Sequence, residues 1–286
     1  MLTERGAVMT IFEAYNNISK RLSAAGIDDS SFEARAIIRH ITGLSNAEIT
    51  ANPMRALTEF QENNITAILR QREIRYPLQY IFGTWDFYKY KFKVGVGVLI
   101  PRSDTETVMD VCLEFIKGKE KADVLDLCAG SGCIGITIKG ECPRSQVTLV
   151  EKYDEAISYA QKNAKHNNID VKIVKGDVLE GCECENKYDL IVSNPPYITA
   201  EDMKALQPEV QFEPKTALEG GEDGLVFYRA IAEKYKNSLK ENGMLVFEVG
   251  INQSESVKEI LRENGFKDIS SRKDLNDIER VVFGTV

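Results

Sequence analysis

Residues 124–139 read VLDLCAGSGCIGITIK, and this stretch decides the fold. A short apolar run, Val124 to Leu127, leads into a turn of small residues and then into a segment, Cys133 to Lys139, that we predict to be helical. A buried strand, a glycine-rich turn and a helix in this order are typical of a doubly wound α/β sheet. We therefore expect an α/β domain with a ligand site at the turn.

From about residue 104 onward, apolar strand-like runs alternate with helical stretches. Continuous Val, Ile and Leu indicate burial on both faces, which favours parallel strands with helices on each side. A charged turn, Lys273 to Glu279, indicates that the last two strands form a hairpin-like pair with one antiparallel strand. The prediction is a seven-stranded, mostly parallel sheet, with strands at 124–127, 147–150, 171–174, 190–193, 244–249, 265–270 and 280–283.

The first 75 residues show helical periodicity instead, with apolar residues recurring every three or four positions. We predict helices at 11–22, 32–41 and 59–72, forming a small helical bundle. Residues 78–82, 87–94 and 98–100 are rich in β-branched and aromatic residues, which favours a hairpin and a short strand. The expected organisation is a helical domain (1–75), a β-hairpin linker (76–103) and an α/β domain (104–286).

Composition restricts the class of protein. The chain has 286 residues, 43% of them hydrophobic, and a net charge of −8, an acidic balance that argues against direct nucleic-acid binding. It contains no recognisable export signal and no apolar run long enough to span a membrane, so we expect a cytoplasmic protein with reduced thiols. Cys182-Glu183-Cys184 lacks the spacing of a zinc site, and only two histidines are present. We predict no metal.

Acidic residues at strand ends indicate the ligand. Glu151 ends the second predicted strand, where it could accept hydrogen bonds from ribose hydroxyls, and Asp177 follows the third, where it suits an adenine amino group. Asp126 precedes the small-residue run and suits the methionyl end of S-adenosylmethionine, whereas NAD would favour a full Gly-x-Gly-x-x-Gly turn. A structural turn without ligand is the alternative. The cofactor-binding residues that we predict are Cys128, Ala129, Gly130, Ser131, Gly132, Glu151, Asp177, Val178 and Asn194.

The fourth predicted strand ends abruptly in Asn194-Pro195-Pro196-Tyr197. The prolines make the turn rigid, and the Asn194 side-chain oxygen and the Pro195 carbonyl can accept both hydrogens of a planar –NH₂ group. Tyr197 could stack on that planar group. This tetrapeptide predicts methylation of an amide or amine nitrogen, with Asn194, Pro195, Pro196 and Tyr197 as the catalytic residues.

From about Leu78 to its C-terminus the chain resembles the HemK/PrmC family, the release factor glutamine N5-methyltransferases. The motifs that carry the resemblance are Pro77 to Gly83, Val98 to Arg102 with Thr105-Glu106, Asp126 to Gly132, Asn194 to Tyr197, Phe212 to Pro214, Ala217-Leu218 and Gly220 to Leu225.

The resemblance implies a class I (Rossmann-like) methyltransferase fold with S-adenosylmethionine as cofactor. It implies that the substrate is the glutamine of the Gly-Gly-Gln motif in peptide chain release factors, and that the helical domain docks the release factor. It also implies that Pro101-Arg102 borders the cofactor. The family usually has glycine where this chain has Cys128, a change that adds a side chain near the cofactor. It usually has Pro-Arg-Pro-Glu-Thr-Glu where this chain reads PRSDTE at 101–106, a mild change.

Three alternatives stay open from the residues alone. A DNA adenine N6-methyltransferase uses the same tetrapeptide, although this chain shows no basic, aromatic DNA-reading domain. A glutamine methyltransferase of a ribosomal protein would share the same catalytic residues. A protein that binds nucleotide without catalysis would keep the turn but has no need of an intact tetrapeptide. We expect a monomer, because no heptad or long exposed apolar stripe is visible.

Overall fold

The computed structural model describes residues 8–181 and 187–286, which form two compact units. The helical unit takes in the described residues up to Phe82 together with Pro208–Phe212, and the sheet unit takes in Gly83–Gln207 and Glu213–Val286. Cys182 and Cys184 lie outside the described residues, and the other four cysteines are free thiols. The three-part division at residues 75 and 103 stays a prediction.

The helical unit consists of five helices around one core. Side chains such as Ile18, Ile37 and Leu69 have no exposed surface, because each lies on the apolar stripe of its helix. Capping boxes begin three of the helices, at Thr10, Ser45 and Thr58, and satisfy N–H groups that would otherwise lack partners. The helices are α1 (Ile11–Ala24), α2 (Ser30–Thr42), α3 (Asn46–Ala51), α4 (Glu59–Glu73) and α5 (Leu78–Phe82).

The helices expected at 11–22, 32–41 and 59–72 are confirmed as α1, α2 and α4. The strand expected at 78–82 is wrong, because the structure has helix α5 there. Pro77 precedes this helix and its carbonyl accepts the N–H groups of Tyr80 and Ile81, while Leu78 is buried in the helical core. Packing of this single turn therefore overrides the β propensity of its side chains.

The sheet unit contains the expected seven-stranded sheet, in the order β5-β4-β3-β6-β7-β9-β8. Strand β9 runs antiparallel to both of its neighbours, and β3 to β7 pair in parallel. The seven-stranded, mostly parallel prediction is therefore confirmed. The strands are β3 (Asp123–Leu127), β4 (Gln146–Glu151), β5 (Lys172–Lys175), β6 (Tyr188–Ser193), β7 (Leu239–Glu248), β8 (Lys267–Lys273) and β9 (Glu279–Thr285).

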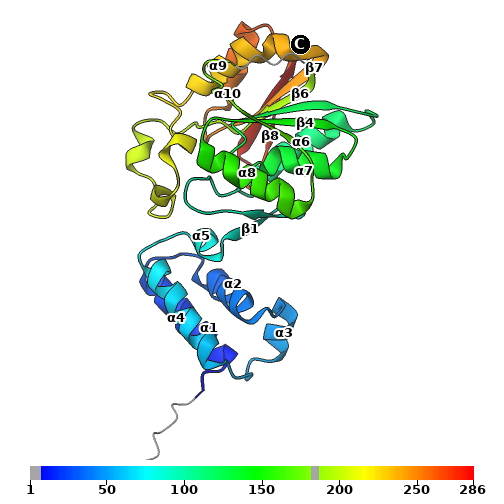
Figure 1. The fold of residues 1–286 in the computed structure, drawn as a ribbon. Coiled ribbons are helices and arrows are strands. Elements are labelled where there is room, and N and C mark those ends of the chain that lie inside the picture. Colours follow the sequence, from blue (N-terminus) through cyan, green and yellow to red (C-terminus); the bar gives the residue numbers. More distant parts are fainter. Residues whose placement is uncertain (1–7, 182–186) are drawn as a thin grey trace, which may run out of the picture. The chain divides into compact units, whose positions relative to one another are not determined.

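Helices cover both faces of this sheet (Figure 1). One apolar core joins the sheet to α6 (Glu106–Ile116), α7 (Cys133–Glu141) and α8 (Asp154–Asn167). A second core on the opposite face joins it to α9 (Val226–Tyr235) and α10 (Ser254–Glu263). This three-layer arrangement leaves the carboxyl ends of the parallel strands as the edge where a ligand can bind.

A hairpin precedes the large sheet, formed by β1 (Thr84–Phe87) and β2 (Tyr90–Lys93), so the expected hairpin is confirmed with shifted bounds. The short strand expected at 98–100 is wrong. The Ile100 N–H donates to the buried carboxylate of Glu213 (2.9 Å), and this side-chain contact takes the place of a strand ladder.

Between β6 and α9 the chain forms a long loop with three short 3₁₀ segments, η1 (Asp202–Lys204), η2 (Val210–Phe212) and η3 (Lys215–Ala217). The middle segment, η2, belongs to the helical unit by its contacts, whereas the segments on either side belong to the sheet unit. The chain thus leaves the sheet unit after Gln207 and returns to it at Glu213.

Candidate active site

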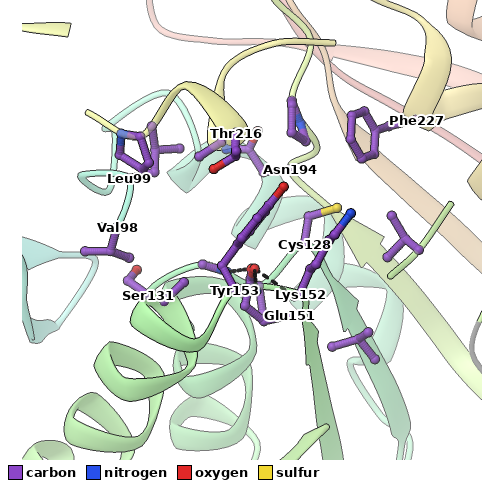
Figure 2. Close-up of a pocket in the computed structure, with 18 of the residues that line it drawn as sticks. Val98, Leu99, Cys128, Ser131, Glu151, Lys152, Tyr153, Asn194, Thr216 and Phe227 are labelled. Atoms are coloured by element: carbon purple, nitrogen blue, oxygen red, sulfur yellow. Dashed lines mark hydrogen bonds between the residues drawn. The ribbon is translucent and has the colours of Figure 1, made fainter. Parts of the chain in front are cut away.

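A cavity of about 320 Å³ lies at the carboxyl ends of β3, β4, β5 and β6 (Figure 2). Its volume is at the lower end of the range usual for small-molecule sites. Nine of the residues predicted from the sequence line it, namely Cys128, Ala129, Gly130, Ser131, Glu151, Asp177, Val178, Asn194 and Pro196. These residues are far apart in the sequence, and the parallel strand order brings them together.

The glycine turn after β3 is held in place by Glu151, the last residue of β4. The Glu151 Oε2 atom accepts the Gly130 N–H (2.9 Å), and its Oε1 atom accepts the N–H groups of Lys152 (2.8 Å) and Tyr153 (3.0 Å). Gly130 has a φ of 55°, and a Cβ built on it would meet open space within 4 Å. The backbone of the turn is therefore accessible to a ligand, and a carboxylate of fixed orientation lies beside it.

Cys128 and Gly132 belong to the same turn as Gly130 but have different surroundings. Cys128 also has a positive φ, 58°, which L residues with a Cβ adopt only at some cost, and its side chain faces the cavity (Figure 2). Gly132 does not line the cavity: a Cβ there would approach Ile136 to 2.8 Å and Leu149 to 3.1 Å. Gly132 is thus needed for the close approach of α7 to the sheet rather than for ligand contact.

Asp126 does not occupy the ligand position suggested by the sequence. Its carboxyl is buried beneath the turn, where Oδ2 accepts the Gly135 N–H (2.9 Å), and Asp126 does not line the cavity. Burial raises the pKa of Asp126 to about 7. The expectation that Asp126 contacts a methionyl group is wrong. Side chains alternate between the two faces of a strand, and the Asp126 side chain points into the protein interior.

Asp177 follows β5 and remains available as an acceptor. Burial alone would raise its pKa, but the Lys152 ammonium (2.6 Å from Oδ2) and the Leu179 N–H lower the pKa below its ordinary value. Asp177 is therefore ionised at neutral pH. Asp177 and Glu151 thus place two carboxyl groups at the cavity, whose lining also contains the cations Arg102, Lys152 and Lys215.

The Asn194 side chain lies at the cavity with its amide direction fixed. Its Nδ2 donates to the Thr105 hydroxyl (3.3 Å), so its Oδ1 is left as the acceptor at the cavity. Pro196 also lines the cavity, whereas Pro195 and Tyr197 do not. The Tyr197 hydroxyl instead lies 3.4 Å from Glu248 Oε1, and burial raises the pKa of Tyr197 well above its usual value.

A neighbouring glycine supports this turn. A Cβ on Gly220 would lie 2.6 Å from the Tyr197 Cα and 2.8 Å from the Pro196 carbonyl oxygen, so only glycine allows the two backbones to pack so closely. The Ile198 N–H donates to the Leu218 carbonyl, and the Gly220 N–H donates back to Ile198. Residues 218–220 therefore fix the position of the tetrapeptide.

Several lining residues come from segments that the strand pattern could not locate. Pro101 and Arg102 line the cavity, as the resemblance implies, and Arg102 is paired with Glu213. Tyr153, Phe227 and residues 215–217 also line it, although no sequence motif pointed to Tyr153 or Phe227 as ligand contacts (Figure 2). Among the described residues no group of three or more His, Cys, Asp and Glu side chains could hold a metal ion.

Replacing Glu151 with glutamine is expected to weaken S-adenosylmethionine binding. An amide nitrogen would then face one of the three backbone N–H groups that the carboxylate now accepts. Loss of a charged hydrogen bond costs about 1.5–3 kcal/mol, so the Kd should rise roughly ten- to hundredfold by calorimetry. Asp154→Asn is the control, since Asp154 is exposed and outside the cavity. Equal affinities for both variants would contradict this role of Glu151.

Comparison with known proteins identifies the class. A family model described as the methyltransferase small domain matches residues 103–269, and the PrmC N-terminal domain matches residues 13–83. The catalytic domain of hMettl16, solved in complex with MAT2A 3′UTR hairpin 1, has a similar fold (TM-score 0.57, 13% identity, covering 86% of this chain and 87% of that one). The fold and the cavity thus define a class I methyltransferase, whose methyl donor is S-adenosylmethionine.

The particular family follows from two relatives. The release factor glutamine methyltransferase of Geobacter sulfurreducens is 36% identical over the full length of both chains. That of Caulobacter vibrioides is 34% identical, over 96% of each chain. This chain belongs to the release factor glutamine methyltransferase family.

The cavity fits S-adenosylmethionine in its size and in the acceptors that it offers. Asp177 supplies an ionised acceptor, Glu151 supplies a carboxyl group of fixed orientation, and the open space at Gly130 admits a ligand close to the backbone. We expect Glu151 to hold the ribose hydroxyls and Asp177 to hold the adenine amino group. In the part of the chain that the structure describes, no helix is both long and apolar enough to cross a membrane.

Proposed function

We propose that this enzyme methylates the side-chain amide nitrogen (N5) of the glutamine in the Gly-Gly-Gln motif of peptide chain release factors. The observation that carries this proposal is the Asn194 amide, which is fixed through Thr105 so that its oxygen faces the cavity. An acceptor in this position suits the –NH₂ group of a glutamine. The relatives' shared name supports the release factor as the protein that presents it.

Positioning and charge stabilisation are the contributions of the protein. S-adenosylmethionine supplies an activated methyl group on a sulfonium. Asn194 Oδ1, which faces the cavity, accepts one of the two amide hydrogens. The Pro195 carbonyl is proposed to accept the other from beyond the cavity lining, so that the nitrogen lone pair is aimed out of the amide plane. The same two acceptors stabilise the positive charge that develops on the nitrogen. Fixing the reacting groups in this way can lower the barrier by several kcal/mol, up to about 7–11 in the best cases.

No strong base is required before transfer, because the methylated amide nitrogen is acidic enough to lose its proton afterwards. The rigid Pro195-Pro196 turn keeps the acceptors in place without further rearrangement. We further propose that Tyr197 provides part of the surface on which the planar amide packs, through its ring edge or backbone, since its hydroxyl points to Glu248.

The helical unit is proposed to dock the release factor, the chain is proposed to act as a monomer in the cytoplasm, and no direct binding of nucleic acid is expected. The other substrates considered are an adenine in DNA and a glutamine of a ribosomal protein. Both present a planar –NH₂ group to the same acceptors, so the test must offer all three substrates to one preparation of enzyme.

The experiment is methyl transfer from labelled S-adenosylmethionine to purified release factor, ribosomal protein and duplex DNA. We expect label on the release factor, and none on a release factor in which the Gly-Gly-Gln glutamine is replaced by glutamate, which has no amide nitrogen. Label on DNA or on the ribosomal protein alone would overturn the substrate assignment. Label on the glutamate-substituted factor would place the reaction at a different residue.

A further inference from the structure

Four polar side chains form a series of contacts that leads from the lining of the cavity into the buried interior. Asn194 Nδ2 donates to the Thr105 hydroxyl (3.3 Å), and the Tyr197 hydroxyl lies 3.4 Å from Glu248 Oε1. The Thr105 hydroxyl lies near enough to the Glu248 carboxyl to lower its pKa, and we take this hydroxyl as the donor that links the two pairs. Thr105 is 1% exposed and Glu248 is 2% exposed. Glu248 thus connects both ends of the Asn194–Tyr197 turn in a region that water does not reach.

The direction of each hydrogen bond follows from the chemistry of the groups. In its ionised form the Glu248 carboxylate can only accept, so in that form the single hydroxyl hydrogen of Thr105 is directed to Glu248. The Thr105 oxygen is then left to accept, and only the NH₂ end of the Asn194 amide can donate to it. Asn194 Oδ1 is therefore turned to the cavity (Figure 2 shows Asn194 at its edge). Without Glu248, the Thr105 hydroxyl could donate to Oδ1 and stabilise the opposite orientation.

Burial of the Glu248 carboxyl at this position is energetically unfavourable. Its Oε2 atom is buried and has no hydrogen-bond partner among the residues that the structure describes. Arg280, the nearby cation, forms ion pairs with Asp104 (3.2 Å) and Asp274 (3.1 Å) and makes none with Glu248. A buried, incompletely satisfied carboxyl costs stability, and such a group calls for an explanation. Its contacts with the tetrapeptide supply one.

We propose that Glu248 is a positioning residue for methyl transfer, which acts through Thr105 to keep the Asn194 oxygen facing the substrate nitrogen. Through the Tyr197 hydroxyl it holds the other end of the same turn. The proposal rests on the proposed function only in taking an –NH₂ group as the methyl acceptor. Glu248 itself does not line the cavity, so it acts on the substrate only through its neighbours.

Glu248→Gln is the first test. We expect kcat to fall roughly ten- to hundredfold, because small misplacements of a reacting group have effects of this size, while the Kd for S-adenosylmethionine stays unchanged. Thr105→Val should lose a similar factor, whereas Thr105→Ser, which keeps the hydroxyl, should retain activity. The double variant Thr105→Val/Glu248→Gln should have a kcat no lower than that of the less active single variant, because both substitutions interrupt the same series of contacts.

A Glu248→Gln enzyme with the kcat of the wild type would overturn the proposal. Losses that multiply in the double variant would also overturn it, because they would mean that the two residues act independently.

The pH profile is a second readout. Burial raises the pKa of Glu248 to about 7, an effect that the Thr105 hydrogen bond and Arg280 partly oppose. We expect wild-type kcat to fall as the pH drops through about 7, because a protonated carboxyl no longer requires Thr105 to donate. This limb should vanish in Glu248→Gln, and a limb that persists would contradict the proposal. The charged and titratable groups facing Glu248 are Arg280, Asp104, Tyr197, Tyr228 and Cys133.

The pH dependence of the free energy of unfolding should also differ between the wild type and Glu248→Gln, in a direction that the raised pKa of Glu248 determines. The folded-state pKa of Glu248 lies above its ordinary value of 4.5, so the group contributes stability at low pH that is lost as the pH rises through about 7. Glu248→Gln should therefore lose less stability than the wild type between pH values of about 4 and 8. Asp126 titrates in the same range, so the variant must be compared with the wild type at each pH.

A third readout needs no substrate. In protein labelled with nitrogen-15 at asparagine, the Asn194 side-chain resonance is identified by its loss in Asn194→Ala. We expect this resonance to shift in Thr105→Val and in Glu248→Gln but to stay in place in Thr105→Ser. An unchanged resonance in an enzyme that methylates release factor would overturn the positioning role alone. A shifted resonance in an enzyme that methylates none of the substrates would preserve the positioning role and overturn the proposed function.

Discussion

Asn194→Ala is expected to reduce kcat for methyl transfer by roughly 10²–10³-fold, the loss usual when one preorganised group that stabilises transition-state charge is removed. The alanine removes the Oδ1 acceptor and leaves Thr105 and Glu248 in place behind it. The substrate amide then loses one of its two acceptors and is free to rotate. The measurement is single-turnover transfer of label to the release factor at saturating S-adenosylmethionine.

Cofactor affinity must be measured beside the rate, because Asn194 also lines the cavity. We expect its Kd to change only a few-fold, on the order of one neutral hydrogen bond. Asn276→Ala, an exposed asparagine in the turn between β8 and β9, is the control and should match the wild type. A rate loss that disappears once cofactor saturation is restored would show that Asn194 binds the cofactor and does not act on the amide.

Arg72→Ala is expected to destabilise the helical unit by about 3–5 kcal/mol, the cost of breaking a buried ion pair. Arg72 is 1% exposed, and its guanidinium donates to both carboxylate oxygens of Glu33 (2.8 and 2.9 Å) and to the Tyr76 carbonyl (2.7 Å). A fourth bond reaches Glu209 (3.2 Å). Its removal leaves Glu33 without its charged partner, and amide hydrogen exchange in α2 and α4 should accelerate accordingly.

A matched variant separates burial from charge. Arg21→Ala removes an ion pair of similar length, 2.7 Å to Glu73, whose side chains are 33% and 35% exposed. Such exposed pairs contribute only about 0–1 kcal/mol, so exchange in the same helices should barely change. Equal destabilisation by Arg21→Ala and Arg72→Ala would contradict the importance of burial.

The helices and strands that could be predicted are those whose residues form a recognisable pattern within a short segment of the sequence. Apolar runs located the five parallel strands of the large sheet, the charged turn at 273–279 located the last two strands, and helical periodicity located α1, α2 and α4. Helix α3 was missed because it has only six residues, although its capping box, Ser45 with Glu48, is a recognisable signal. Helix α5 was predicted as a strand because its composition favours β structure and only its packing in the helical core decides otherwise.

The residues of the cavity, too, could be predicted from the sequence only in part. Glu151, Asp177 and Asn194 could be found because each ends or follows a parallel strand, and the ends of these strands meet at one edge. Glu248 also lies near the end of a predicted strand, 244–249, and is the last residue of β7. Its connection with Thr105 joins residues 143 positions apart in the sequence, the difference between 248 and 105. Residues 215–217 reach the cavity from the loop that precedes α9, and Phe227 reaches it from the first turn of α9, so long-range contacts determine both positions.

Because the chain returns to the helical unit at Glu209, the ion pairs of this unit are completed only late in the synthesis of the protein. Glu209 pairs with Arg75 (2.6 Å) and with Arg72, 137 positions earlier in the sequence. At ribosomal rates of about 5–20 residues per second, this partner emerges on the order of ten seconds after Arg72. A nascent helical unit therefore folds with part of its ion-pair network missing, and the network closes only after β3 to β6 have been made. A fragment ending at Phe82 would keep that early state permanently.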